Sequence, residues 1–170
     1  MYTCRFARTI EAPWTTREPI SLGAVPSGSG TPARYCLVEH QQGPVMRLDV
    51  YGPDMAFADA QIWNGWVVIG FADAIHFVSL ATKQEHSVPL RGYFASLSPT
   101  DEVLLVASAS DLLCFNREAT LQWRTDDLGI DGVVIQSVDN AVIRGEGEWD
   151  PPGNWRPFTL SLQSGSTIAE

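Results

Sequence analysis

The chain has 170 residues, of which 45% are hydrophobic and 18% are charged, and this composition excludes a disordered chain because it supplies enough apolar surface to offset the entropy lost on folding. Its length is that of one ordinary domain. The net charge of −9 falls mostly in residues 98–170, which contain 12 acidic residues and four arginines. Such a surface repels phosphate, so nucleic acid and anionic membranes are poor partners and a basic protein or a cation is a better one. The alternative is that the acidic residues only keep the chain soluble.

The N-terminal part is predicted to contain no targeting signal. The first 20 residues lack the apolar core of a secretory signal, and no run approaches 18 consecutive apolar residues. Cys4, Cys36 and Cys114 are widely spaced and odd in number, so the sequence predicts neither a C-x-x-C motif nor a disulfide framework. These features predict a cytoplasmic protein in which Cys114 is a small buried side chain of a strand.

Residues 1–34 are interpreted as an N-terminal segment, and residues 35–170 as a single all-β repeat domain. Within the segment, Ile10 to Trp14 is predicted to be a short strand that joins a sheet formed later in the chain. Gly23 to Pro32 is dense in Gly, Pro and Ser, so it is predicted to be a loop. The only helical candidate is Pro53 to Ala60, because apolar residues nowhere recur at helical spacing over a dozen positions.

From Tyr35 onward, short runs of Val, Ile, Phe, Trp and Thr are bounded by Gly, Asp and Pro, which is the pattern of strands joined by turns. Three hairpins are predicted, and they pair Tyr35–Glu39 with Val45–Val50, Trp66–Phe71 with Ile75–Leu80, and Val103–Ala107 with Leu112–Phe115. Outer strands are predicted at His86–Leu90 and Leu121–Trp123.

The chain repeats itself at an offset of 38 residues. Six of the 24 positions from Trp63 to His86 find the same residue 38 positions later, and the pairs are Val68 and Val106, Asp73 and Asp111, Phe77 and Phe115, Ala81 and Ala119, Thr82 and Thr120, and Gln84 and Gln122. A further copy is predicted near the C-terminus, where seven extra residues around Glu146 to Trp155 enlarge the tip of the last hairpin. Such a period indicates one supersecondary unit built several times.

The segment from Phe94 to Trp123 resembles a blade of a β-propeller. An inner strand leads through S-P-T-D to a second strand, a third strand ends in an aromatic residue, and an outer strand ends in L-Q-W. The resemblance extends over residues 63–168 at superfamily level, without the Gly-His and Trp-Asp pairs of WD repeats at blade ends. It implies all-β meanders of three or four antiparallel strands, stacked as a partial, open or small ring. An antiparallel β-sandwich or barrel is the alternative.

The inserted tip carries the candidate binding residues, which are Glu146, Glu148, Trp149, Asp150 and Trp155. Two tryptophans on a proline-stiffened tip offer a large contact area at a small entropic cost, as interface anchors do. Alternatively the indoles fold back over the end of the sheet as a lid, or each plays one role. The surrounding tail, G-E-G-E-W-D-P-P-G-N-W, is similar to a signature of small bacterial proteins without an assigned activity.

Metal and cofactor motifs are weak in this sequence. Asp126, Asp127 and Asp131 fail the twelve-residue spacing of a calcium loop, and the three histidines lack zinc-binding spacing. A G-x-S-x-G motif and a phosphate-binding loop are also missing. We therefore expect no metal, no cofactor and no catalytic residue.

The favoured function is a non-enzymatic protein-interaction module, whose partner is another protein or a second copy of the chain. The alternative is a small-ligand or carbohydrate binder or hydrolase that uses the acidic residues at the hairpin tips.

Overall fold

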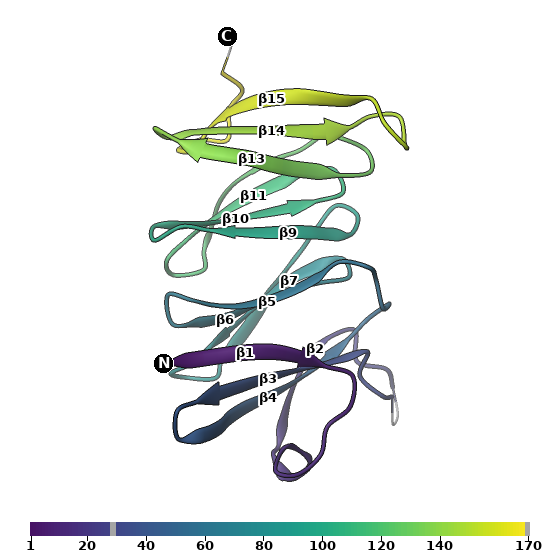
Figure 1. Ribbon diagram of the computed structural model, residues 1–170, viewed down its shortest axis with the longest axis vertical. Coiled ribbons are helices and arrows are strands. Elements are labelled where there is room, and N and C mark those ends of the chain that lie inside the picture. The colour runs from purple at the N-terminus through teal and green to yellow at the C-terminus, as the bar shows by residue number, and fades with distance from the viewer. Residues whose placement is uncertain (28–29, 169–170) are drawn as a thin grey trace. The chain divides into compact units, whose positions relative to one another are not determined.

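The computed structural model describes residues 1–27 and 30–168, and this part of the chain forms four small β-sheets without an α-helix (Figure 1). Each sheet has three or four strands, and none closes into a barrel. The chain divides into two compact units, Met1–Val88 and Pro89–Glu170. The prediction of an all-β fold built from small, mostly antiparallel meanders is therefore confirmed.

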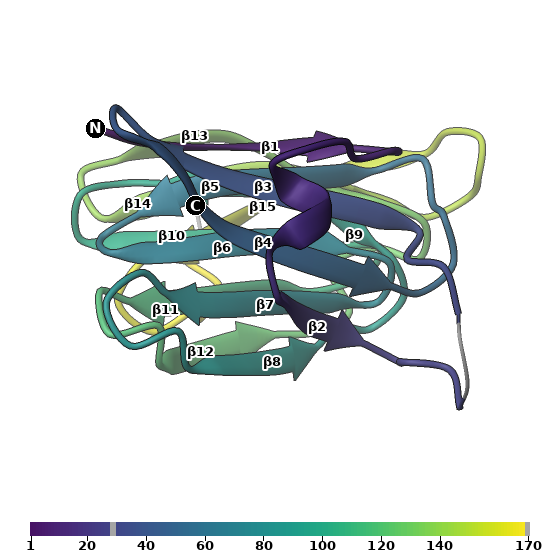
Figure 2. The same cartoon turned by 90° about the horizontal axis from the view of Figure 1, so that it is seen from below.

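The first unit contains two four-stranded sheets. The first sheet has the order β1-β3-β4-β2, made by β1 (Tyr2–Ala7), β3 (Arg34–His40), β4 (Gly43–Tyr51) and β2 (Pro19–Gly23), and β2 runs parallel to β4. The second is the meander of β5 (Ala58–Trp63), β6 (Trp66–Phe71), β7 (Ala74–Ser79) and β8 (Glu85–Pro89). The two sheets are in contact through β1 and β5, which Figure 2 labels.

The second unit repeats this construction with one strand fewer. Its first sheet is the meander of β9 (Phe94–Pro99), β10 (Val103–Ser108), β11 (Leu112–Asn116) and β12 (Leu121–Thr125). The last sheet contains β13 (Val133–Asp139), β14 (Val142–Glu148) and β15 (Trp155–Ser161). The connection between β14 and β15 is the enlarged tip that the repeat alignment predicts.

Two predicted elements near the N-terminus are wrong. The strand lies at Tyr2–Ala7 and not at Ile10 to Trp14, where the main-chain N–H of Trp14 donates to Glu11 O (2.8 Å) and starts a short 3₁₀ turn, η1 (Trp14–Thr16). Pro53 to Ala60 forms no helix, because its last three residues pair with β6 and this pairing overrides local helix propensity. The predicted loop is confirmed at residues 24–27 and 30–32, and residues 28–29 lie outside the described part.

Each unit has a core between its two sheets. In the first unit, Leu48, Val50, Ile69 and Phe71 belong to one buried cluster. In the second, the buried cluster is formed by Leu105, Leu112, Cys114, Val133, Ile143 and Leu160. The repeated Phe77 and Phe115 are both fully buried, so the two similar sequences form similar hairpins with their aromatic side chains inside.

One repeated position differs sharply in burial. Asp73 is exposed, whereas Asp111 is fully buried in the turn between β10 and β11. The Ser108 hydroxyl donates a hydrogen bond to the Asp111 carboxylate, and Nε of Arg124 on β12 lies 3.2 Å from the same group. Burial raises the pKa of Asp111, against the lowering effects of Ser108 and Arg124. The ion pair therefore links the outer strand β12 to the hairpin of β10 and β11. It also leaves the Asp111 carboxylate buried, which is unfavourable.

Removing the guanidinium of Arg124 leaves the Asp111 carboxylate buried without its counter-charge. We expect Arg124→Ala to lower the free energy of unfolding by about 2–3 kcal/mol at pH 7, somewhat less than for a fully buried pair. A carboxyl whose pKa is raised by folding stabilises the protein at low pH, and this stability is lost as the pH rises through the folded-state pKa. The loss should therefore shrink as the pH falls toward about 4.

Urea unfolding of wild type and variant at both pH values measures this difference. The control is Arg117→Ala, which removes an exposed ion pair to Glu102 from the same sheet and should change the free energy of unfolding by less than about 1 kcal/mol at either pH. A loss in Arg124→Ala that is the same at both pH values would contradict the role given to Asp111.

Candidate functional site

The candidate residues lie at one end of the last sheet, where β14 leads into β15. Glu146 and Glu148 belong to β14, Trp155 begins β15, and Trp149 and Asp150 lie in the tip between these strands. Glu148 is paired with Trp155 across the two strands. Because paired residues of antiparallel strands project to the same face, and alternate residues of one strand do too, Glu146, Glu148 and Trp155 share one face.

This shared face points away from the core of the second unit. Ile143 lies on the opposite face of β14 from the two glutamates, and it is fully buried in the core. On β13, Val133 is 1% exposed, whereas Val134, which is paired with Glu146, is 47% exposed. We call this surface the outer face, and it consists of Val134, Glu146, Glu148, Trp155 and Pro157.

Polar and apolar side chains are arranged in rows on the outer face. The two glutamates lie on the central strand β14, with Val134 on one side of Glu146 and Pro157 on the other. The Trp155 indole is 44% exposed, and it lies beside Gly132, where an added Cβ would be 3.2 Å from the ring. A short acidic stripe is thus bordered by apolar groups on both sides.

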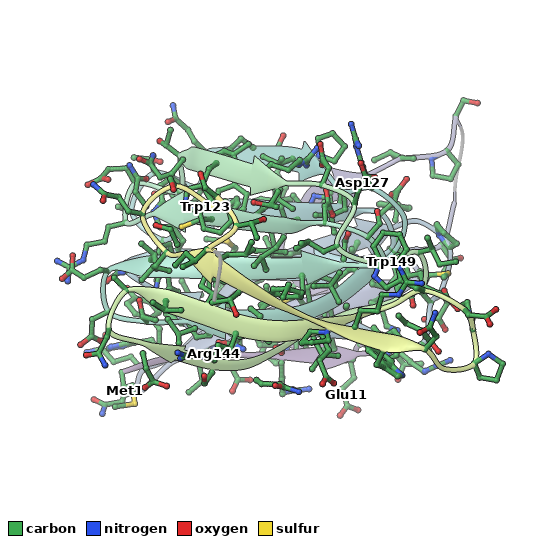
Figure 3. The ribbon with its side chains drawn as sticks, turned by 90° about the horizontal axis from the view of Figure 1, so that it is seen from above. Met1, Glu11, Trp123, Asp127, Arg144 and Trp149 are labelled. Atoms are coloured by element: carbon green, nitrogen blue, oxygen red, sulfur yellow. The ribbon has the colours of Figure 1, made fainter. Side chains whose placement is uncertain are left out.

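Trp149 lies on the other side of the strand. It is half-buried, and Figure 3 labels its side chain. The guanidinium carbon of Arg156 is 5.2 Å from its ring centroid, a cation–π contact. Arg156 is paired with Gly147, where an added Cβ would be 1.7 Å from the carbonyl oxygen of Leu128, so this close approach of the chain requires glycine. The structure therefore separates the two indoles, with Trp155 on the outer face and Trp149 behind it.

The tip is held by Glu148. Its Oε1 accepts a hydrogen bond of 2.6 Å from the main-chain N–H of Gly153, and the N–H groups of Trp149 and Asp150 donate to Asn154 O and Gly153 O, both at 3.3 Å. Gly153 has a φ of 132°, which favours glycine. Asp150 is exposed on this turn, and its main chain bonds to the same glycine that Glu148 holds.

Further residues that the sequence analysis did not single out lie at the same end of the unit. The Tyr93 hydroxyl donates a hydrogen bond to the main-chain oxygen of Asp131 and lies 3.2 Å from its carboxylate. Burial raises the pKa of Tyr93, and the charges of Asp131 and Glu148 raise it further. Ile130, which is 56% exposed, donates its N–H to Glu148 O (2.7 Å). The strand that carries Val134 of the outer face was not predicted from the sequence either.

The candidate carboxylates do not line the cavity that lies beside β15. A cavity of about 260 Å³ beside β15 is lined by Pro157, Phe158, Thr159, Thr167 and Ile168, none of which is a candidate carboxylate. Residues 1–27 and 30–168 contain no group of three or more side chains placed to hold a metal ion. Among these residues there is also no helix with the length and apolar character that crossing a bilayer requires.

Comparison of the chain with models of known protein families and with curated proteins found no match. Its function has to be inferred from the surface itself.

If Glu148 holds the tip, its removal should loosen the tip selectively. We expect Glu148→Ala to speed the hydrogen exchange of the Gly153 amide at least about tenfold, because a hydrogen bond to a charged acceptor contributes about 1.5–3 kcal/mol. NMR measurement of amide exchange tests this. Glu146→Ala is the matched control, since Glu146 lies on the same face two residues earlier and the described contacts give it no bond to the tip. Equal protection of Gly153 in both variants would contradict the assignment.

Proposed function

We propose that this chain is a non-enzymatic protein-interaction module of the cytoplasm that binds its partner through the outer face of the last sheet. The observation that carries the proposal is the exposed indole of Trp155, which lies on one sheet face with Val134 and the stripe of Glu146 and Glu148. Tryptophan is among the residues most enriched at interface hot spots, where a rigid ring is desolvated at a small entropic cost.

The charge of the second unit indicates the kind of partner. Residues 89–170 contain 12 acidic residues and five arginines, which gives 5 − 12 = −7 of the total net charge of −9. Such a surface attracts a basic partner and speeds the encounter. Arg144 lies on the same face, two residues before Glu146 on β14. The acidic stripe is therefore confined to the part of the outer face near the tip. A partner segment with a lysine or arginine next to an apolar side chain would match this pattern.

The sheet architecture supports the same proposal. Small repeated meanders resemble the blades of a propeller, in which each sheet covers a face of its neighbour. The last sheet buries its inner face within the second unit, so its outer face is available to bind a partner. Its β15 edge is a poorer site for an added strand, because Pro157 has no N–H to donate and Thr159 O already accepts from Ile168 N (2.9 Å).

The hydrolase alternative needs two carboxylates that converge on one bond in a cleft. Glu146 and Glu148 instead lie side by side along one strand of an open sheet face. The interaction module is therefore the better explanation of these residues.

Photo-crosslinking tests the outer face directly. A photoreactive amino acid at position 134 should capture a partner in lysate, whereas the same amino acid at position 118, an exposed turn of the first sheet of this unit, should not. Trp155→Ala should weaken the binding of the captured partner at least about tenfold, as expected for a hot-spot residue.

Trp149→Ala is the matched control, because this indole lies behind the face, and it should lower the stability of the unit more than the affinity. Urea unfolding of both variants separates the two effects. A Trp155→Ala variant that is folded and binds the captured partner as tightly as wild type would refute the proposal. A crosslinked dimer of the chain would identify the partner as a second copy.

A further inference from the structure

Two cysteines that are far apart in the sequence are neighbours in the first sheet. β1 runs antiparallel to β3, with Cys4 opposite Val38 and Phe6 opposite Cys36. The two cysteines are therefore diagonal neighbours on the same face. Each thiol shifts the pKa of the other, and both are free. The spacing of the cysteines gave no sign of this pair, because the strand that contains Cys4 was not predicted.

The two thiols differ in access to solvent. Cys36 is 0% exposed and belongs to the core of the first unit, whereas Cys4 is half-buried and packs against the edge of that core. A small reagent from solution meets Cys4 first. Cys114 lies in β11 of the second unit and is 1% exposed.

The contact between the thiols also makes their acidities unequal. The Cys36 thiol lowers the pKa of Cys4, although burial and the Asp59 carboxylate oppose this effect. The Cys4 thiol and burial raise the pKa of Cys36. Burial raises the pKa of Cys114 to about 11. Because the thiolate is the nucleophile, Cys4 is the most reactive of the three.

We propose that Cys4 and Cys36 form a reversible disulfide within the chain when a peroxide is present, with Cys4 attacking and Cys36 resolving. The thiolate sulfur of Cys4 attacks one oxygen of hydrogen peroxide, an S–O bond forms, the O–O bond breaks, and the departing hydroxide takes a proton to become water. Sγ of Cys36 then attacks Sγ of Cys4. The S–S bond forms, the S–O bond breaks, and the second water leaves with the Cys36 proton.

In this sequence two thiols lose two electrons, and one peroxide is reduced to two waters. A dithiol reductant reverses it by thiol–disulfide exchange. The disulfide would join β1, an edge strand of its sheet, to β3, which lies next to it. An edge strand held by hydrogen bonds can separate from its sheet by local unfolding, and the covalent link prevents this separation. The oxidised protein should therefore protect the amides of β1 more strongly than the reduced protein does.

The test uses the full chain, first reduced and then treated with hydrogen peroxide. Intact-mass analysis should show a loss of about 2 Da, the mass of two hydrogens. Titration after denaturation should find one thiol in place of three, and peptide mapping should identify a Cys4–Cys36 link. Dithiothreitol should restore all three thiols, and hydrogen exchange should slow in Tyr2–Ala7 only in the oxidised form.

Three variants complete the experiment. Cys114→Ser should give the same disulfide, and it is the matched control. Cys36→Ser should stop at the sulfenic acid of Cys4, which dimedone traps, and Cys4→Ser should retain both remaining thiols. The proposal is refuted if wild type keeps three thiols, if Cys4 is oxidised further while Cys36 stays free, or if the links join different chains. These wild-type readouts do not depend on the folding of any variant.

Discussion

A β-sheet of three or four strands cannot bury either of its faces by itself, and this constraint determines the construction of both units. Each unit places two such sheets against each other, and the apolar side chains between them form its core. The arrangement stabilises four small sheets without an α-helix in the described part of the chain. In the last sheet the second face is exposed at Val134 and Trp155, so its composition can serve another purpose.

The proposed function assigns partner binding to the second face of the last sheet. Side chains alternate along β13 and β14, so Val133 and Ile143 enter the core while Val134 and Glu146 point outward. Here the exposed Val134 and the indole of Trp155 border two carboxylates, and this combination is what the proposed interaction depends on.

Most of the fold could be predicted from the sequence, because alternating apolar residues and turn residues are local signals. All three predicted hairpins and both outer strands are present. The strand of Cys4 and the extended conformation of Ala58 depend on partners far along the chain, β3 and β6, which local patterns do not reveal. For the same reason the sequence could name Trp149 and Trp155 but could not assign them to opposite sides. The pairing of Trp155 with Glu148 and the contact of Trp149 with Arg156 decide that. The different burial of Asp73 and Asp111 shows that an identical residue in a repeat need not have an identical environment.

The central claim is that one face of the last sheet is covered and the other is open. Solution NMR of the methyl-labelled protein with a soluble paramagnetic agent tests it at adjacent residues of one strand. The account predicts strong broadening of the Val134 methyl signals and little broadening of those of Val133, Ile143 and Leu160, which are at most 1% exposed. Equal broadening of Val133 and Val134, or protection of both, would contradict it.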